Sequence, residues 1–218
     1  MEEIRALAPT GMLGSGYSEA SLTKAMGWEP HFIACDAGST DGGPDALATG
    51  KCHFSSFAVK RDIKLMLMAA RSARVPLIIG SAGSGGGDLN LQWTHDIVAE
   101  IVREEDLHFR LGIIHSEQDK EYLKGKLQEE KIRPLNPAPP IDDEVINRSA
   151  HIVGMMGAEP IAKILEEGAE VVLTGRASDT SLFAAVPLAR GFPEGPVWHA
   201  AKILECGAAC AAIRRAPD

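Results

Sequence analysis

The sequence has few aromatic residues, no block of positive charge and no apolar run long enough to cross a membrane. Aromatic side chains make up 5% of the 218 residues, and acidic residues outnumber basic ones by 30 to 22, which gives a net charge of −8. A nucleic-acid surface requires clustered basic residues, and a membrane span requires roughly 20 consecutive apolar residues. The composition therefore favours neither class of protein.

The sequence also lacks disulfide-type cysteine spacing and a secretory signal. The four cysteines form no C-x-x-C pair. Cys206 and Cys210 would share one face of a helix, which fits a metal pair but fits two buried structural residues better. The N-terminus has no basic segment followed by an apolar one. We therefore expect a cytoplasmic protein.

Short apolar runs alternate with amphipathic segments along the whole chain, a pattern typical of α/β proteins. It predicts a single α/β domain over residues 1–218, with a mostly parallel β-sheet flanked by helices. Strands are expected near 4–8 and at 32–35, 77–80, 109–114 and 170–174. Helices are expected at 60–73, 92–103, 119–128, 142–156 and 161–167. The proline-rich residues 134–140 are expected to be a stiff connector within this domain.

Glycines and polar side chains gather directly after the predicted strands. The segments are GMLGSGYSE (11–19), DAGSTDGGPD (36–45), SAGSGGGD (81–88), HSEQDKE (115–121) and GRASDTS (175–181). In parallel α/β sheets the carboxyl ends of the strands share one edge, and ligands bind there. We therefore expect the ligand loops at this edge.

The glycine-rich loop at 81–88 is not a nucleotide loop. The P-loop pattern GxxxxGK[ST] is absent, and Asp88 stands where a dinucleotide fingerprint needs its third glycine. The sequence thus contains no ATP or NAD motif. The loop fits either an anion site formed by its backbone N–H groups or a tight turn without a ligand. In the first case Ser81, Gly83 and Gly85 would bind substrate, as would Ser15 and Gly16 in the loop at 14–18.

Carboxylates follow the second predicted strand. Asp36 stands at the strand end and could act as a general base, or with Asp41 hold a divalent cation such as Mg²⁺. Asp45 fits ordinary turn chemistry better. Ser39 lies in the same loop and is a candidate for binding substrate.

His115 follows the strand at 109–114 and is a second candidate acid or base, because histidine titrates near neutral pH. His115 and Glu117 form an H-x-E pair, but the P-C-x-x-C partner of the zinc deaminases is absent. Glu117 is a candidate for substrate binding. Ser116 and Asp119 are predicted to cap the following helix.

Arg176 and Asp179 complete the candidate set. An arginine at a strand end suits bidentate recognition of a carboxylate or phosphate, and Asp179 is a third candidate for catalysis. The alternative is that the two side chains simply pair with each other and close the loop.

Several stretches in collinear order resemble the acyclic terpene utilisation (AtuA-like) family. They are GSGYSE, ACDAGSTDGGP, KRDIKLML, PLIIGSAGSGGGD, IHSEQDKEYLK, PAPPIDDEVINRS, GRASDTSLFAA and WHAAKILECGA, and all of them lie within residues 14–209. The resemblance implies a cytosolic catabolic protein that degrades branched terpenoid acids or related carboxylates. Members of the family extend further beyond the LECGA stretch, so the chain resembles the N-terminal region.

These observations lead to two hypotheses. The first is an enzyme domain that acts on a small carboxylate or acyl substrate by hydrolysis, hydration or lyase-type proton transfer. Asp36 or His115 would move the proton, and Arg176 would hold the anion. The second is a non-catalytic subunit that binds substrate or supports assembly with a partner chain. In either case we expect a homo-oligomer or a partner subunit.

Overall fold

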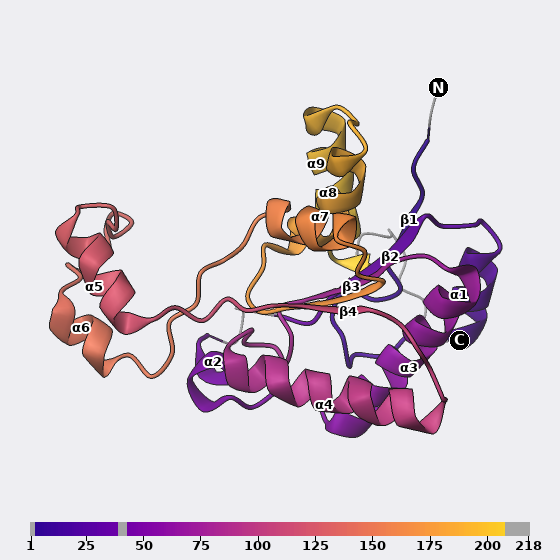
Figure 1. Ribbon diagram of the computed structural model, residues 1–218, viewed down its shortest axis with the longest axis horizontal. Coiled ribbons are helices and arrows are strands. Elements are labelled where there is room, and N and C mark those ends of the chain that lie inside the picture. Colours follow the sequence, from indigo (N-terminus) through magenta and orange to yellow (C-terminus); the bar gives the residue numbers. More distant parts are fainter. Residues whose placement is uncertain (1–2, 39–42, 208–218) are drawn as a thin grey trace.

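Five short strands pair side by side in one parallel sheet, in the order β1-β2-β3-β5-β4 (Figure 1). The computed structural model describes residues 3–38 and 43–207. The strands are β1 (Ala6–Leu7), β2 (Phe32–Asp36), β3 (Leu77–Gly80), β4 (Leu111–Ile114) and β5 (Val171–Thr174). The predicted α/β class with a parallel sheet is confirmed.

Helices cover both faces of the sheet. They are α1 (Glu19–Met26), α2 (Asp45–Thr49), α3 (Ser56–Ala73), α4 (Asp88–Glu104), α5 (Lys120–Gln128), α6 (Asp143–Arg148), α7 (Glu159–Glu166), α8 (Asp179–Ala189) and α9 (Glu194–Leu204). Side-chain oxygens cap several N-termini, as at Ser55 of α3 and Asp119 of α5. Such caps satisfy N–H groups that have no partner within the helix.

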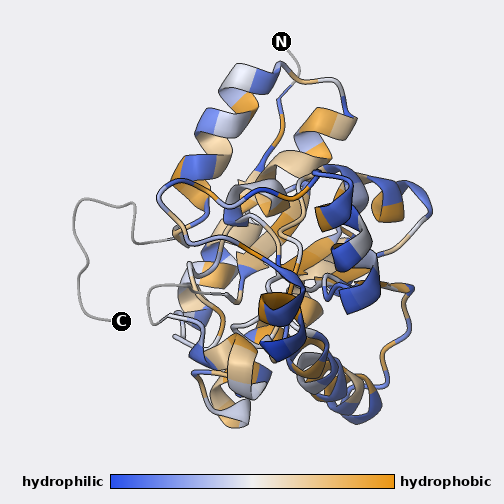
Figure 2. Ribbon diagram, turned by 90° about the vertical axis from the view of Figure 1, so that its left-hand side faces the viewer, coloured by the Kyte–Doolittle hydropathy of each residue, from blue (hydrophilic) through white to orange (hydrophobic). Residues whose placement is uncertain are grey.

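Two apolar layers form the core, one on each face of the sheet. Alternate strand residues such as Ile33 and Ile79 pack against α3 and α4, while Ala34 and Ile78 pack against α7, α8 and α9. Figure 2 shows apolar residues concentrated at the sheet and polar ones on the outer helix surfaces. No helix in the described part of the chain is long and apolar enough to span a membrane.

The connections after neighbouring strands diverge at the carboxyl end of β3 and β5. The chain leaves β3 toward α4 on one face, and it leaves β5 toward α8 on the other (Figure 1). A crevice opens where such connections part, and this is where open α/β sheets bind their ligands. The topology therefore favours a ligand site at the loops after β2, β3 and β5.

The predicted helix at 142–156 is wrong beyond its first turns. Helix α6 ends at Arg148, and the chain then runs extended, pairing Val153 with Glu117 and Met156 with Ala177. Consecutive β-branched residues, Ile152 and Val153, favour this extended backbone. Strand β4 is shorter than predicted, and helices α1, α2, α8 and α9 are additional to those predicted.

Helices α5 and α6 form an arm that projects from the α/β body beyond the carboxyl end of β4 (Figure 1). We call residues 119–149 the arm. Helix α5 has no buried residue, and α6 buries only Ile146. The arm therefore has almost no core of its own.

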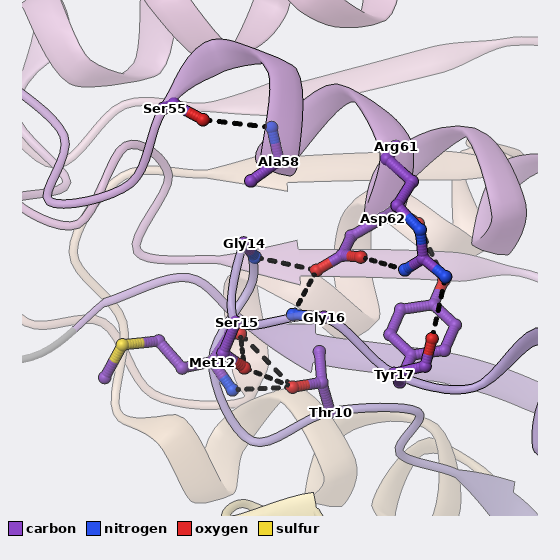
Figure 3. Close-up of polar contacts among 10 residues, drawn as sticks. All are labelled: Thr10, Met12, Gly14, Ser15, Gly16, Tyr17, Ser55, Ala58, Arg61 and Asp62. Atoms are coloured by element: carbon purple, nitrogen blue, oxygen red, sulfur yellow. Dashed lines mark hydrogen bonds and ion pairs between the residues drawn. The ribbon is translucent and has the colours of Figure 1, made fainter. Parts of the chain in front are cut away.

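A buried carboxylate on α3 anchors the loop that follows β1 (Figure 3). Oδ2 of Asp62 accepts hydrogen bonds from the backbone N–H groups of Gly14 (2.9 Å) and Gly16 (3.0 Å), and Oδ1 pairs with Arg61 (2.8 Å). Both glycines have positive φ, a conformation that glycine adopts without steric cost. The Tyr17 hydroxyl donates to the Asp62 carbonyl at 2.7 Å. Asp62 thus fixes the path of residues 10–17.

We expect Asp62→Ala to lower the free energy of unfolding by about 2–4 kcal/mol, because it leaves two backbone donors without an acceptor. Asp62→Asn retains one acceptor oxygen and should lose less. Urea unfolding followed by circular dichroism measures both. Asp143→Ala, on the exposed start of α6, is the control and should change stability by less than about 0.5 kcal/mol. An Asp62→Ala protein as stable as this control would contradict the anchoring role.

Candidate functional site

A cavity of about 530 Å³ lies at the carboxyl edge of the sheet, beside the ends of β2 and β5. It is bounded by the loops after β1, β2 and β5, the start of α8, the end of α9 and the extended segment before α7. Its lining residues are Gly11, Met12, Asp36, Gly38, Met155, Arg176, Ser178, Asp179, Thr180, Lys202, Glu205 and Cys206. Three of the predicted site residues, Asp36, Arg176 and Asp179, therefore share one cavity.

Asp36 is the last residue of β2 and is only 2% exposed. Its Oδ2 accepts a hydrogen bond from the Gly38 N–H at 3.0 Å. Within the described residues, its Oδ1 is buried and has no hydrogen-bond partner. Buried polar atoms are nearly always paired, so an unpaired carboxyl oxygen at a cavity wall points to a ligand or a chemical role.

The surroundings of Asp36 favour its uncharged form. Burial raises the pKa of Asp36 well above its usual range, and the nearby Asp179 carboxylate raises it further. The Arg176 guanidinium, the Gly38 N–H and the Ser81 hydroxyl lower this pKa, but they do not outweigh burial. Burial and the Glu205 carboxylate also raise the pKa of Asp179, against the opposing charge of Arg176. Asp36 can therefore hold a proton inside the cavity.

Arg176 brings a positive charge to the same wall. Its side chain is 12% exposed, and its guanidinium lies 3.7 Å from Oδ1 of Asp179 and 3.4 Å from the Ser84 carbonyl. These contacts are longer than the charge-assisted hydrogen bonds that arginine usually makes. The guanidinium therefore retains the capacity to bind an anion.

Ser116, which sequence analysis placed at a helix cap, instead holds the backbone of Arg176. Asp119 caps α5, as predicted. The Ser116 hydroxyl donates to the Gly86 carbonyl (2.7 Å) and accepts from the Arg176 N–H (2.6 Å), and the residue is buried. The prediction for Ser116 is wrong because its hydroxyl lies against the neighbouring strand-end loops. It links the loops that follow β3, β4 and β5.

The opposite wall of the cavity comes from parts of the chain that sequence analysis did not assign to the site. Lys202 and Glu205, near the end of α9, form an ion pair there. Met12 and Met155 supply flexible apolar surface. A Lys and a Glu three residues apart on a helix predict a pair, but nothing in the sequence places that pair opposite Asp36.

His115 and Glu117 lie in a separate cluster at the end of β4 and are not among the residues that line the cavity. His115 is 65% exposed, and its Nδ1 lies 2.8 Å from Oδ1 of Asp88. Glu117 accepts from the Asp88 N–H (2.8 Å) and pairs with His151 (2.5 Å). These residues join the start of α4 to the extended segment before α7.

The glycine-rich loop is closely packed around a buried side chain. Nδ2 of Asn90 donates to carbonyls of Ala46 and Gly83. A Cβ at Gly83 or Gly85 would lie within 2.6 Å of atoms of Asn90. Backbone N–H groups along the loop already have acceptors within the chain, namely those of residues 81, 82, 85, 86, 87 and 88. The loop therefore does not present these donors to an anion.

Four other predicted binding residues, Ser15, Gly16, Ser39 and Ser81, fall behind the cavity wall or outside the described residues. Ser81 is fully buried, and its hydroxyl bonds to the backbone of Ala177. In the loop after β1, Ser15 bonds to Met12 and the Gly16 N–H to Asp62. The candidates Ser39 and Asp41, as well as Cys210, lie outside the described residues.

No group of three or more His, Cys, Asp or Glu side chains in residues 3–38 and 43–207 is placed to hold a metal ion. The divalent cation proposed for Asp36 and Asp41 stays a prediction, since Asp41 is not described. The described cavity contains carboxyl groups, two cationic side chains and the N-terminus of α8.

The raised pKa of Asp36 predicts a pH-dependent stability. An unfolded Asp ionises near pH ~3.9, whereas the folded protein retains this proton to higher pH. Its stabilising contribution is complete below the unfolded pKa and is lost as the pH rises through the folded pKa. Asp36→Asn cannot ionise, so its stability relative to wild type should rise with pH, by at most about 1.4 kcal/mol per pH unit. Urea unfolding at several pH values tests this, and a pH-independent difference would contradict it. Asp45→Asn is the exposed control.

If Ser116 positions Arg176, Ser116→Ala should raise the pKa of Asp36 further, because the guanidinium that lowers it becomes less well placed. The carboxyl carbon signal of Asp36, followed by NMR during a pH titration, reports this directly. Ser72→Ala, on the exposed side of α3, should leave the titration unchanged. An unchanged titration in Ser116→Ala would show that the hydroxyl does not act through Arg176.

Comparison with known proteins identifies one family. The model of "Acyclic terpene utilisation family protein AtuA" matches residues 58–211. No curated protein and no solved structure matches the chain. The matched segment covers more than half of the 218 residues and includes Arg176, Asp179 and the α9 wall of the cavity, while Asp36 precedes it. The chain therefore belongs to the acyclic terpene utilisation family AtuA.

Proposed function

We propose that the chain binds a small carboxylate or acyl substrate in the cavity beside Asp36 and catalyses a proton transfer on it. The observation that carries this proposal is the carboxyl group of Asp36. It is buried, its Oδ1 has no hydrogen-bond partner among the residues that the structure describes, and it lines the cavity with Arg176. The family description, which refers to acyclic terpene utilisation, supports a catabolic role. The reaction would be a hydrolysis, hydration or lyase-type step.

Arg176 would bind the carboxylate or the acyl oxygen of the substrate. Its guanidinium offers planar donors, and its contact with Asp179 is loose enough, at 3.7 Å, to be exchanged for a substrate oxygen. The backbone N–H groups at the N-terminus of α8, where Asp179 and Thr180 line the cavity, contribute a partial positive charge on the same side. An anion would thus be held between the guanidinium and the helix end.

Asp36 would act as the proton donor. Its raised pKa favours the protonated form, which can donate a proton as the substrate develops negative charge, and burial of the side chain strengthens the electrostatic interaction. Asp179, with a side chain 44% exposed, would accept a proton from substrate or water on the solvent side. Two carboxyl groups in different surroundings can divide the roles of acid and base in this way.

His115 is a weaker candidate for the same reaction. Its imidazole is exposed and paired with Asp88 rather than directed at the residues that line the cavity. We therefore assign the proton transfer to Asp36 and Asp179. A structural role, in which the loop after β4 is held in place, better explains the contacts among His115, Asp88, Glu117 and His151.

The experiment uses a panel of short saturated and α,β-unsaturated carboxylic acids as probes. Binding is measured by calorimetry, and turnover is followed in D₂O by NMR as incorporation of deuterium or addition of water. We expect Arg176→Lys to weaken binding at least tenfold, because the bidentate contact is lost. Asp36→Asn should abolish turnover while changing affinity by less than about threefold.

Arg190→Lys, directly after α8, and Asp45→Asn, at the start of α2, change exposed residues; they are the matched controls and should behave as wild type. Binding that is lost in Arg176→Lys, together with no turnover by the wild type, would instead favour the non-catalytic subunit. Turnover that survives in Asp36→Asn would exclude Asp36 as the proton donor.

A further inference from the structure

Strand β4 lies at one end of the sheet, and its outer edge pairs with no other strand among the described residues. On its inner side, the carbonyls of Arg110 and Ile114 accept hydrogen bonds from the N–H groups of Glu170 (2.9 Å) and Gly175 (2.8 Å). Alternate residues of a strand direct their main-chain groups to opposite edges, so those of Leu111 and Ile113 face away from β5. The Ile113 side chain is 37% exposed. An edge of this kind is a template for pairing with another strand.

An apolar hollow lies next to this edge, at the amino end of β4. It has a volume of about 470 Å³ between α4 and β4, and its floor includes Val98, Val102, Phe109 and Leu111. At the other end of β4, the chain enters the arm. The arm exposes Tyr122 by 57% and Val145 by 46%. The molecule thus carries an apolar hollow at one end of β4 and exposed apolar side chains beyond the other.

Charges are distributed unequally along the same edge. Arg103 and His108 line the hollow at the amino end of β4, where Asp106 and Arg110 are also exposed. Asp88 and Glu117 lie at the carboxyl end, next to His115 and His151. When two copies of this edge pair in antiparallel fashion, each basic end lies beside an acidic end. Self-complementarity of this kind is what a two-fold interface requires.

We propose that two copies of the chain form a dimer by antiparallel pairing of their β4 strands, an inference independent of the proposed function. The two-fold axis passes at Gly112, so that Leu111 of one copy lies opposite Ile113 of the other. The outward-facing main-chain groups of these residues then form the hydrogen-bonded pairs of an antiparallel ladder. The sheet continues through both copies.

The same arrangement accounts for the arm. The arm projects beyond the carboxyl end of β4 (Figure 1), and in the antiparallel pair this end lies beside the amino end of the second copy's β4. The arm therefore approaches the hollow of the second copy. Helices α5 and α6 have 9 and 6 residues, fewer than the roughly 12–15 that an isolated helix needs to be stable. Contact with a second copy supplies the apolar cover that the arm lacks.

Analytical ultracentrifugation of the full chain over a range of concentrations tests the proposal. Ile113→Pro removes an outward N–H without touching the ladder to β5, and Ile113→Lys places a charge at the interface. We expect each to raise the dimer dissociation constant at least tenfold, and Tyr122→Asp to raise it by a smaller factor. Ile203→Lys, at an isoleucine of similar exposure on α9, should leave the constant unchanged.

Amide hydrogen exchange gives a second readout that does not depend on a variant folding correctly. The N–H groups of Leu111 and Ile113 should exchange slowly at high concentration of the wild-type protein and faster on dilution. A wild type that is monomeric at all concentrations would overturn the proposal. So would a dimer that is unaffected by Ile113→Lys and whose Leu111 amide exchanges at a rate independent of concentration.

Discussion

The burial of the Asp36 carboxyl group is the constraint on which the arrangement of the cavity depends. Removing a carboxyl group from water is unfavourable unless it is paired or protonated. The protein meets this with one backbone donor, Gly38, and with the Arg176 guanidinium nearby, and it leaves Oδ1 unpaired within the described residues. A side chain at Gly38 would come within 2.5 Å of both Ser81 and Arg176. The absence of a side chain there therefore lets three strand-end loops converge around one acid.

The glycines near the site serve close approach between parts of the chain. A Cβ on Gly86 would lie 2.5 Å from the Arg176 nitrogen, and one on Gly175 would lie 2.3 Å from the Ser116 hydroxyl. The glycine-rich loop thus holds the backbone from which the Arg176 side chain extends. Its contribution to the cavity is indirect, because it supports the arginine and the N–H groups of residues 81, 82 and 85–88 already have acceptors within the chain. Glycine-rich segments occur where a ligand approaches the backbone closely, but they also occur where two parts of the chain approach each other closely, as they do here.

Sequence analysis could predict the sheet and the edge at which the cavity lies, because apolar runs and the position of the loops after them depend only on local pattern. It could also predict that Asp36, Arg176 and Asp179 lie near one another, since Asp36 ends β2 and the other two residues follow β5 in the loop and at the start of α8. It could not place Lys202, Glu205 or Met155 beside them, because their position depends on how α9 and the segment before α7 pack in three dimensions. Asp62 was missed for a similar reason. Its two partners lie 46 and 48 residues away in the sequence.

One extended segment of the chain connects the arm to the cavity. The extended segment that leaves the arm hydrogen-bonds on one side to residues next to β4, through Gly154 and Ser116 (2.8 Å), and on the other side to Arg176 through Met156 (3.1 Å). Met155, between these two contacts, lines the cavity. Contacts that order the arm therefore also restrict the positions of Met155 and of the Arg176 backbone. Local stability differs between parts of a fold, and the poorly packed arm is expected to be one of the less stable parts. The restriction on Met155 and Arg176 would therefore be weakest on the side of the arm. The shape of the cavity and the packing of the arm are consequently not independent properties of this chain.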